Sequence, residues 1–204
     1  MNSINMNNNP NSVNELVNNQ NNESNETQMS VEDRLVKYSF YITYSFLVTT
    51  ATITFIEAMR NKDTNIRHVL NLETCISVVA AFFYGVFMKK INVPKINYKE
   101  ININRYMDWS ITTPIMLLVL LLAFGYNTKK KVTVSSFFLI LVLNYAMLGF
   151  GFMGENNLMN KKKANILGFI FFALMYYYIY VNYIAGFNNS DNVMLYLAFL
   201  IFWG

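Results

Sequence analysis

An arginine and an aspartate interrupt an otherwise apolar stretch of the sequence, in the segment Arg105-Tyr-Met-Asp108-Trp-Ser-Ile-Thr112-Thr-Pro114. Placing such a charge at the centre of a membrane-spanning helix costs roughly 2.5 to 3.5 kcal/mol, so residues of this kind are usually functional. The spacing puts Arg105, Asp108 and Thr112 on one helical face, with Met116 one turn further. We expect this face to point at a polar group, because a buried carboxylate needs a nearby cation.

The helix that carries these residues is one of several apolar stretches. Of all residues, 54% are hydrophobic and 14% are charged, and the mean hydropathy is +0.25, which indicates a membrane protein. The stretches cover approximately residues 36–58, 69–88, 106–124, 132–153, 166–185 and 193–204. The first five are long enough to cross a bilayer, which takes about 20 residues. The sixth stops at Gly204 without a polar cap, so we expect a truncated record or gene.

The first 34 residues differ from the rest, because they are rich in asparagine and poor in aromatic residues. Such a segment cannot bury enough apolar surface to order itself, so a disordered tail is expected over residues 1–34. No apolar segment of a cleavable signal peptide follows Met1. The predicted membrane domain covers residues 35–204.

The sequence argues against several other classes of protein. Cys75 is the only cysteine and His68 the only histidine, so a metal site is not expected. There is no glycine-rich phosphate loop and no Ser/His/Asp set, so no enzymatic activity is expected. The net charge of +4 is spread over loops, which gives no nucleic-acid-binding patch.

The segment from Arg105 to Pro114 resembles the third helix of the microbial rhodopsins, a family of seven-helix retinal proteins. Gly151-Phe-Met-Gly154-Glu155 resembles the corresponding part of proteorhodopsins, and Phe202-Trp203-Gly204 resembles the start of the tryptophan motif of helix six. Asn71-Leu-Glu73, together with the asparagine-rich tail, is most similar to the rhodopsins of giant viruses. The resemblance covers nearly everything after residue 35.

This resemblance implies an all-α membrane protein, a seven-transmembrane-helix bundle of which helices one to five and part of helix six are present. It implies a multi-pass protein with its N-terminus outside the cell or in a lumen, bound to all-trans retinal and surrounded by the lipid bilayer. Homo-oligomers are common in the family. In the family, a lysine of helix seven binds retinal as a protonated Schiff base. Every lysine here lies at a span end or in a loop, so we expect the binding lysine beyond residue 204.

The resemblance also implies roles for individual residues. Asp108 is expected to be the counter-ion and proton acceptor of the Schiff base, with Thr112 donating a hydrogen bond to it and Arg105 stabilising its charge. The expected retinal pocket consists of Trp109, Thr113, Met116, Met147, Gly151 and Trp203. Methionines, aromatic residues and glycines at helical spacing are otherwise most often packing residues, so without Asp108 beside them the pocket would not be predicted.

One departure from the family pattern concerns proton supply. Outward proton pumps carry a carboxylate three turns beyond the counter-ion, where this chain has Val119. A count of helical turns places Glu73 in the same half of the membrane as Val119. Glu73 is therefore a candidate proton donor, or a gate and cation site of a channel. Its alternative role is that of a helix-end glutamate whose carboxylate reaches water.

Two classes of function follow. The first is a retinal photoreceptor that moves protons or small cations in response to light. Within this class, a light-gated cation channel is favoured over a light-driven proton pump. A sensory rhodopsin is a further alternative. The second is a truncated membrane protein that lacks its chromophore and has no photochemistry. A solute transporter is disfavoured, because the spans show no internal repeat.

Overall fold

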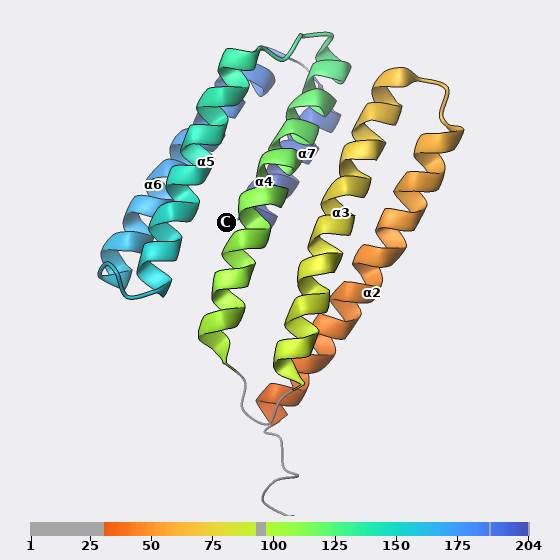
Figure 1. Ribbon diagram of the computed structural model, residues 1–204. Coiled ribbons are helices and arrows are strands. Elements are labelled where there is room, and N and C mark those ends of the chain that lie inside the picture. The colour runs from red at the N-terminus through yellow and green to blue at the C-terminus, as the bar shows by residue number, and fades with distance from the viewer. Residues whose placement is uncertain (1–30, 93–96, 188, 204) are drawn as a thin grey trace, which may run out of the picture.

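The computed structural model describes residues 31–92, 97–187 and 189–203 as a bundle of helices (Figure 1). Within these ranges the chain forms six α-helices and one π-helical turn, and no strand. The elements are α2 (Val31–Arg60), α3 (Thr64–Ile91), α4 (Tyr98–Thr128), α5 (Val134–Glu155), α6 (Lys161–Ile179), η1 (Tyr180–Ile184) and α7 (Ser190–Trp203). The all-α fold predicted from the sequence is confirmed. Residues 1–30 of the predicted tail, Lys95 and Gly204 lie outside the described residues.

Five helices, α2 to α6 with η1 added to the last, are long and apolar enough to cross a membrane. Each runs antiparallel to the next, so the connections alternate between the two ends of the bundle (Figure 1). The helices α2, α3 and α4 extend beyond the predicted apolar stretches at both ends, because polar turns continue each helix outside the hydrocarbon region. The described part of α7 has 14 residues, fewer than a full span needs.

Short polar side chains define where the helices begin. The Asp63 carboxylate accepts hydrogen bonds from the N–H groups of Asn65 and Ile66 at the start of α3. Asn97, Thr133 and Asn160 cap α4, α5 and α6 in the same way. These caps satisfy N–H groups that have no partner inside the helix, so they fix the boundaries between spans.

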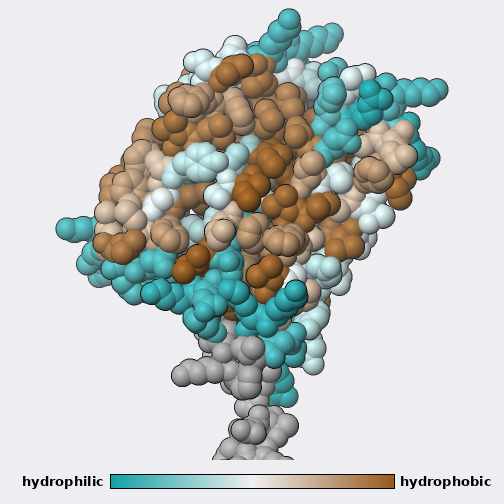
Figure 2. Space-filling view, viewed as in Figure 1, coloured by the Kyte–Doolittle hydropathy of each residue, from teal (hydrophilic) through white to brown (hydrophobic). Residues whose placement is uncertain are grey.

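The outer surface of the bundle is apolar over the middle of the helices. Figure 2 shows hydrophobic residues across the centre of the visible face and hydrophilic residues gathered at its ends. Phe46, Phe82 and Phe138 are examples of large hydrophobic side chains that are mostly exposed. A surface of this kind is stable in contact with lipid chains and not with water.

Inside the bundle, α4 is the central helix. Its buried residues Leu117, Leu120 and Phe124 form one apolar cluster with residues of α5, α6 and η1, and side chains of α7 pack against that cluster. A second cluster joins α3 to the start of α4 through Phe87 and Ile101. The residues of α4 that carry charge and hydroxyl groups are therefore held by helices on several sides.

A π-helical turn ends the fifth span and was not predicted from the sequence. The N–H of Ala185 donates to the carbonyl of Tyr180, which is the wider spacing of a π-helix. Lys130, in the connection between α4 and α5, donates through Nζ to the carbonyl of Asn182 in this turn, and its amine lies 5.0 Å from the Tyr183 ring centroid. The turn thus holds the end of the fifth span against the end of α4.

Candidate functional site

The carboxyl group of Asp108 is buried inside the bundle. The residue is 5% exposed, although it is ionisable and lies within a membrane-spanning helix. Its Oδ1 atom is buried and has no hydrogen-bond partner. An unpaired buried polar oxygen is costly, so this atom is placed to receive a proton donor or a cation.

Thr112 lies one turn from Asp108, as the sequence predicted. Its hydroxyl donates to the backbone carbonyl of Asp108 at 2.9 Å, and the side chain is also close enough to interact with the Asp108 carboxyl. Thr113 donates to the carbonyl of Trp109 at 2.7 Å. Hydroxyls that bond back to the preceding turn are typical of Ser and Thr inside membrane helices.

Arg105 lies on the same side of α4 and stacks on an aromatic ring. Its guanidinium carbon is 4.7 Å from the ring centroid of Trp109, a cation–π contact. Neither of the two ion pairs found among the described residues involves Arg105. Tyr84 of α3 interacts electrostatically with both Arg105 and Asp108, and sequence reasoning did not identify it.

A buried amide also reaches this part of α4. Asn144 of α5 is fully buried, and its Nδ2 donates to the Thr113 hydroxyl at 2.8 Å. Its Oδ1 has no partner. Sequence reasoning missed Asn144, although a lone amide in an apolar span was the available signal.

The predicted pocket residues come from three helices, and the structure describes all of them. Trp109, Thr113 and Met116 lie on α4, while Met147 and Gly151 lie on α5, all of them partly or fully buried. Trp203 of α7 packs against the apolar cluster around α4 and α6. The position of α7 is set at its other end, where Asn127 Nδ2 of α4 donates to Asn192 Oδ1 at 2.7 Å.

The phenol of Tyr106 lies beside Gly151. A Cβ atom at this position would lie 2.8 Å from the hydroxyl oxygen of Tyr106, so the glycine makes room for that phenol ring. The Tyr106 ring contacts Trp109 at 5.2 Å and Phe152 at 5.4 Å between centroids. Tyr106 therefore joins the aromatic wall of the site between α4 and α5.

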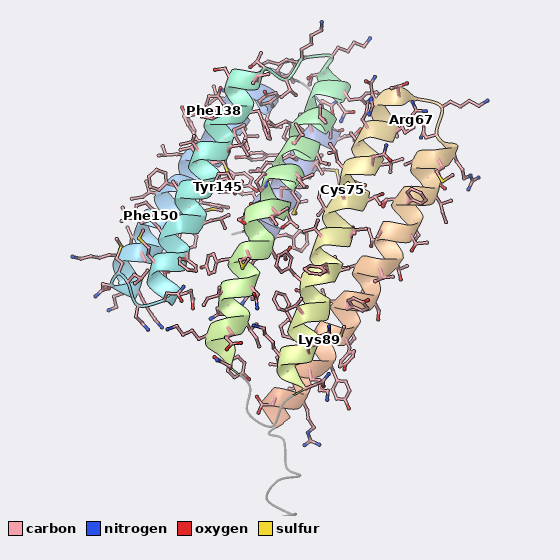
Figure 3. The ribbon with its side chains drawn as sticks, viewed as in Figure 1. Arg67, Cys75, Lys89, Phe138, Tyr145 and Phe150 are labelled. Carbon is pink, nitrogen blue, oxygen red and sulfur yellow. The ribbon has the colours of Figure 1, made fainter. Side chains whose placement is uncertain are left out.

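Glu73 lies apart from Asp108, towards the other end of the bundle. It is half-buried and lines an open cavity of about 1410 Å³ between α3 and the end of α4. His68, Asn71 and Asn127 line the same cavity. Val119 is buried on α4. Figure 3 labels Cys75, another residue of this cavity, on α3 between Arg67 near one end of the helix and Lys89 near the other.

Two further glutamates, Glu57 and Glu155, lie at helix ends. Glu57 is exposed and forms an ion pair with Arg60 at 3.2 Å. Glu155 accepts a hydrogen bond from Asn102 at 3.4 Å near the end of α5. Among the described residues no group of His, Cys, Asp or Glu side chains is arranged to hold a metal ion.

Comparison with known proteins gives a consistent result. The family model described as bacteriorhodopsin-like protein matches residues 34–204. The chain is similar to the crystal structure of viral rhodopsin OLPVRII, with 53% sequence identity, a TM-score of 0.78 and coverage of 83% of this chain and 79% of the other. It is similar in fold to a blue light-absorbing proteorhodopsin from Med12, with 19% identity, a TM-score of 0.62 and coverage of 81% and 71%. A search of curated proteins found no match.

Proposed function

This chain belongs to the bacteriorhodopsin-like protein family, and on that premise we propose that it moves protons or small cations across a membrane in response to light. It is a light-responsive retinal protein that crosses the membrane several times, as the resemblance implied. The family assignment does not distinguish a channel from a pump. That choice rests on the residues of the site.

The Asp108 carboxyl carries the proposal. Retinal, bound through a lysine as a protonated Schiff base, supplies light absorption and a buried positive charge. The unpaired, buried Oδ1 of Asp108 fits such a charge, because a buried anion and a buried cation each need the other. Asp108 would hold the cation in the dark and accept its proton after illumination. Thr112, whose hydroxyl donates to the backbone carbonyl of Asp108 and whose side chain is close to the carboxyl, would help to orient that carboxyl.

The remaining site residues would enclose the chromophore. Trp109, Thr113 and Met116 offer apolar and hydroxyl groups from α4, and Met147 and Trp203 offer apolar side chains from α5 and α7. Gly151 contributes indirectly, since it lets Tyr106 approach. Together they would exclude water from the polyene, which favours one bound geometry.

We propose that the lysine that binds retinal is not among the lysines that the structure describes. These lysines all lie in connections or within the first or last two turns of a helix: Lys37, Lys62, Lys89, Lys90, Lys99, Lys129, Lys130, Lys131, Lys161, Lys162 and Lys163. A lysine that reaches Asp108 must come from the middle of a span. We therefore place the attachment site beyond residue 204.

Between the two transport modes, a light-gated cation channel has more support than a proton pump. Val119 cannot donate a proton, which removes the usual supply for outward pumping. Glu73 lines an open cavity with further polar groups, and a carboxylate in such a place attracts cations. The pump stays the second candidate, because Asp108 and Thr112 are both in place.

The direct test is a voltage-clamp recording of the light-induced current in membranes that contain the retinal-bound protein. A channel current reverses sign when the voltage crosses the equilibrium potential of the permeant cation. A pump current keeps one sign over the same range. A reversing current that follows the cation gradient is expected, and a current of constant sign would replace the channel with the pump.

Other properties follow from the family and belong to the proposal. We place the N-terminus on the extracellular or lumenal side and assign the chain no enzymatic activity. A homo-oligomer is expected from the family.

A further inference from the structure

Pro114 breaks the hydrogen-bond pattern of α4 next to the candidate site. Proline has no N–H, so the carbonyl four residues earlier, that of Ser110, lacks the i to i−4 hydrogen bond that an α-helix normally supplies. An unpaired carbonyl is unfavourable in the hydrocarbon region, where no water is present to satisfy it. Something else has to donate to Ser110 for this turn to be stable.

The donor comes from the neighbouring helix. The hydroxyl of Tyr145 on α5 donates to the Ser110 carbonyl oxygen at 3.0 Å. Tyr145 follows directly after Asn144, whose amide donates to Thr113 at 2.8 Å. Two consecutive residues of α5, Asn144 and Tyr145, therefore hold α4 at the turn that Pro114 weakens, and Figure 3 shows Tyr145 on this part of α5.

This bond completes a row of hydroxyl contacts that includes the backbone of Asp108. Four consecutive carbonyls of α4, those of residues 107–110, accept bonds from side-chain hydroxyls. The donors are, in the same order, Ser110, Thr112, Thr113 and Tyr145. The first three belong to α4 itself, and Tyr145 is the donor from another helix. It therefore ties the turn that carries Asp108 to α5.

We propose that Tyr145 is a positioning residue: its hydroxyl replaces the N–H that Pro114 lacks, and so sets the bend of α4 and the place of the Asp108 carboxyl. Proline kinks persist at the angle that the surrounding contacts allow. The segment before Pro114 carries Asp108, and the contact to Ser110 links that segment to α5. The part of this inference that concerns retinal rests on the proposed function.

The first test measures the carbonyl itself and needs no chromophore. The protein is labelled with 13C at serine carbonyls, and the infrared amide band is compared between the unsubstituted protein and Tyr145→Phe. Loss of the bond should move the Ser110 component to higher frequency. The change should vanish when Ser110→Ala removes that label from both proteins. An unchanged serine band in Tyr145→Phe would overturn the proposal.

A second background tests whether Tyr145 substitutes for the proline N–H. Pro114→Ala restores an N–H that can reach the Ser110 carbonyl. In that background Tyr145→Phe should shift the band much less than it does beside proline. An equal shift in both backgrounds would contradict the replacement, because it would mean that Tyr145 acts independently of Pro114.

The retinal-bound protein supplies the readout for positioning. Tyr145→Phe should shift the visible absorption maximum, since the distance from Asp108 to the chromophore changes. Tyr177→Phe is the matched control, because this tyrosine of α6 is 68% exposed and loses the same hydroxyl. A carbonyl shift without an absorption shift would overturn the positioning role. Absence of a visible band in the unsubstituted protein, expressed with the downstream reading frame included, would instead refute the proposed function, and with it the role towards retinal. The carbonyl result would still decide whether the bond exists.

Discussion

At the scale of single residues, Asp108 combines three properties that rarely occur together. It is ionisable, it is 5% exposed within a span, and its Oδ1 has no partner. Its neighbours contribute hydroxyl groups and aromatic rings, while Arg105 stacks on Trp109 at 4.7 Å instead of forming an ion pair. The carboxyl is thus free to act on a further group, which is what a counter-ion requires.

Glu73 gives the clearest prediction for a single residue. Replacing it by glutamine keeps the size and removes the negative charge from the cavity between α3 and α4. If Glu73 attracts the transported cation, the light-induced current of Glu73→Gln should fall several-fold while the visible absorption band stays. The measurement is a voltage-clamp recording at constant illumination.

Glu57→Gln is the control for that experiment, because Glu57 is exposed and already paired with Arg60. Its current should equal that of the unsubstituted protein. An undiminished current in Glu73→Gln would remove Glu73 from the transport pathway and leave it as a glutamate that reaches water from a helix.

Sequence reasoning proposed part of the candidate site, and that part depends on local spacing. Arg105, Asp108 and Thr112 could be recognised because helical periodicity alone puts them on one face. Tyr84 could not, since its contact with this face comes from a different helix. Asn144 carried a signal, a lone amide in an apolar span, but its partner Thr113 lies on another helix and could not be predicted from spacing. Gly151 was predicted to leave room for a chromophore ring, and the structure shows Tyr106 in contact range there.

At the scale of elements, the end of α4 depends on close packing at Gly125. A Cβ atom there would lie 2.6 Å from the backbone carbonyl oxygen of Lys130, which cannot move without changing the connection to α5. Gly125→Ala should therefore be less stable than Gly149→Ala by about 1 to 3 kcal/mol. Thermal unfolding in detergent measures the difference.

The comparison with Gly149 isolates the clash. Both glycines lie in helices, so both substitutions gain about the same helix propensity, up to about 1 kcal/mol. A Cβ atom at Gly149 meets nothing within 4 Å. Equal stability of the two variants would show that the connection after α4 adapts at no cost.

The cap of α3 predicts a dependence of stability on pH. The N–H of Asn65 donates to Asp63 at 2.8 Å and lowers the pKa of this carboxyl below its usual range, with help from Ile66 and the Tyr126 hydroxyl. Because the pKa is lower in the folded state, the cap stabilises above the ordinary pKa of aspartate and this contribution is lost as pH falls through the folded value.

Asp63→Asn should keep a capping side chain and remove this part of the acid sensitivity, measured as the change of melting temperature between neutral and acidic pH. Asp191→Asn, in the exposed first turn of α7, should leave the sensitivity unchanged. If both variants lose stability on acidification as the unsubstituted protein does, the Asp63 cap does not contribute to it.

At the scale of the whole molecule, the number and order of the spans followed from the sequence because a bilayer imposes a length and an apolar composition on every helix. The helix ends were harder to predict, since caps such as Asp63 lie outside the apolar stretches. The π-helical turn at Tyr180–Ile184 had no local signal: its carbonyl at Asn182 is held by Lys130, which is distant in sequence. The contact of Tyr145 with Ser110 was equally hidden, because it depends on how α5 lies against α4.

The central claim is that Asp108 faces the positive charge of bound retinal. The most direct measurement is an absorption spectrum with added all-trans retinal, recorded for residues 1–204 and for the same chain with any downstream reading frame included. We predict a visible band in the longer form that hydroxylamine bleaches and that shifts in Asp108→Asn, with no such band from residues 1–204 alone. A band that does not move in Asp108→Asn, or no band in either form, would contradict the account.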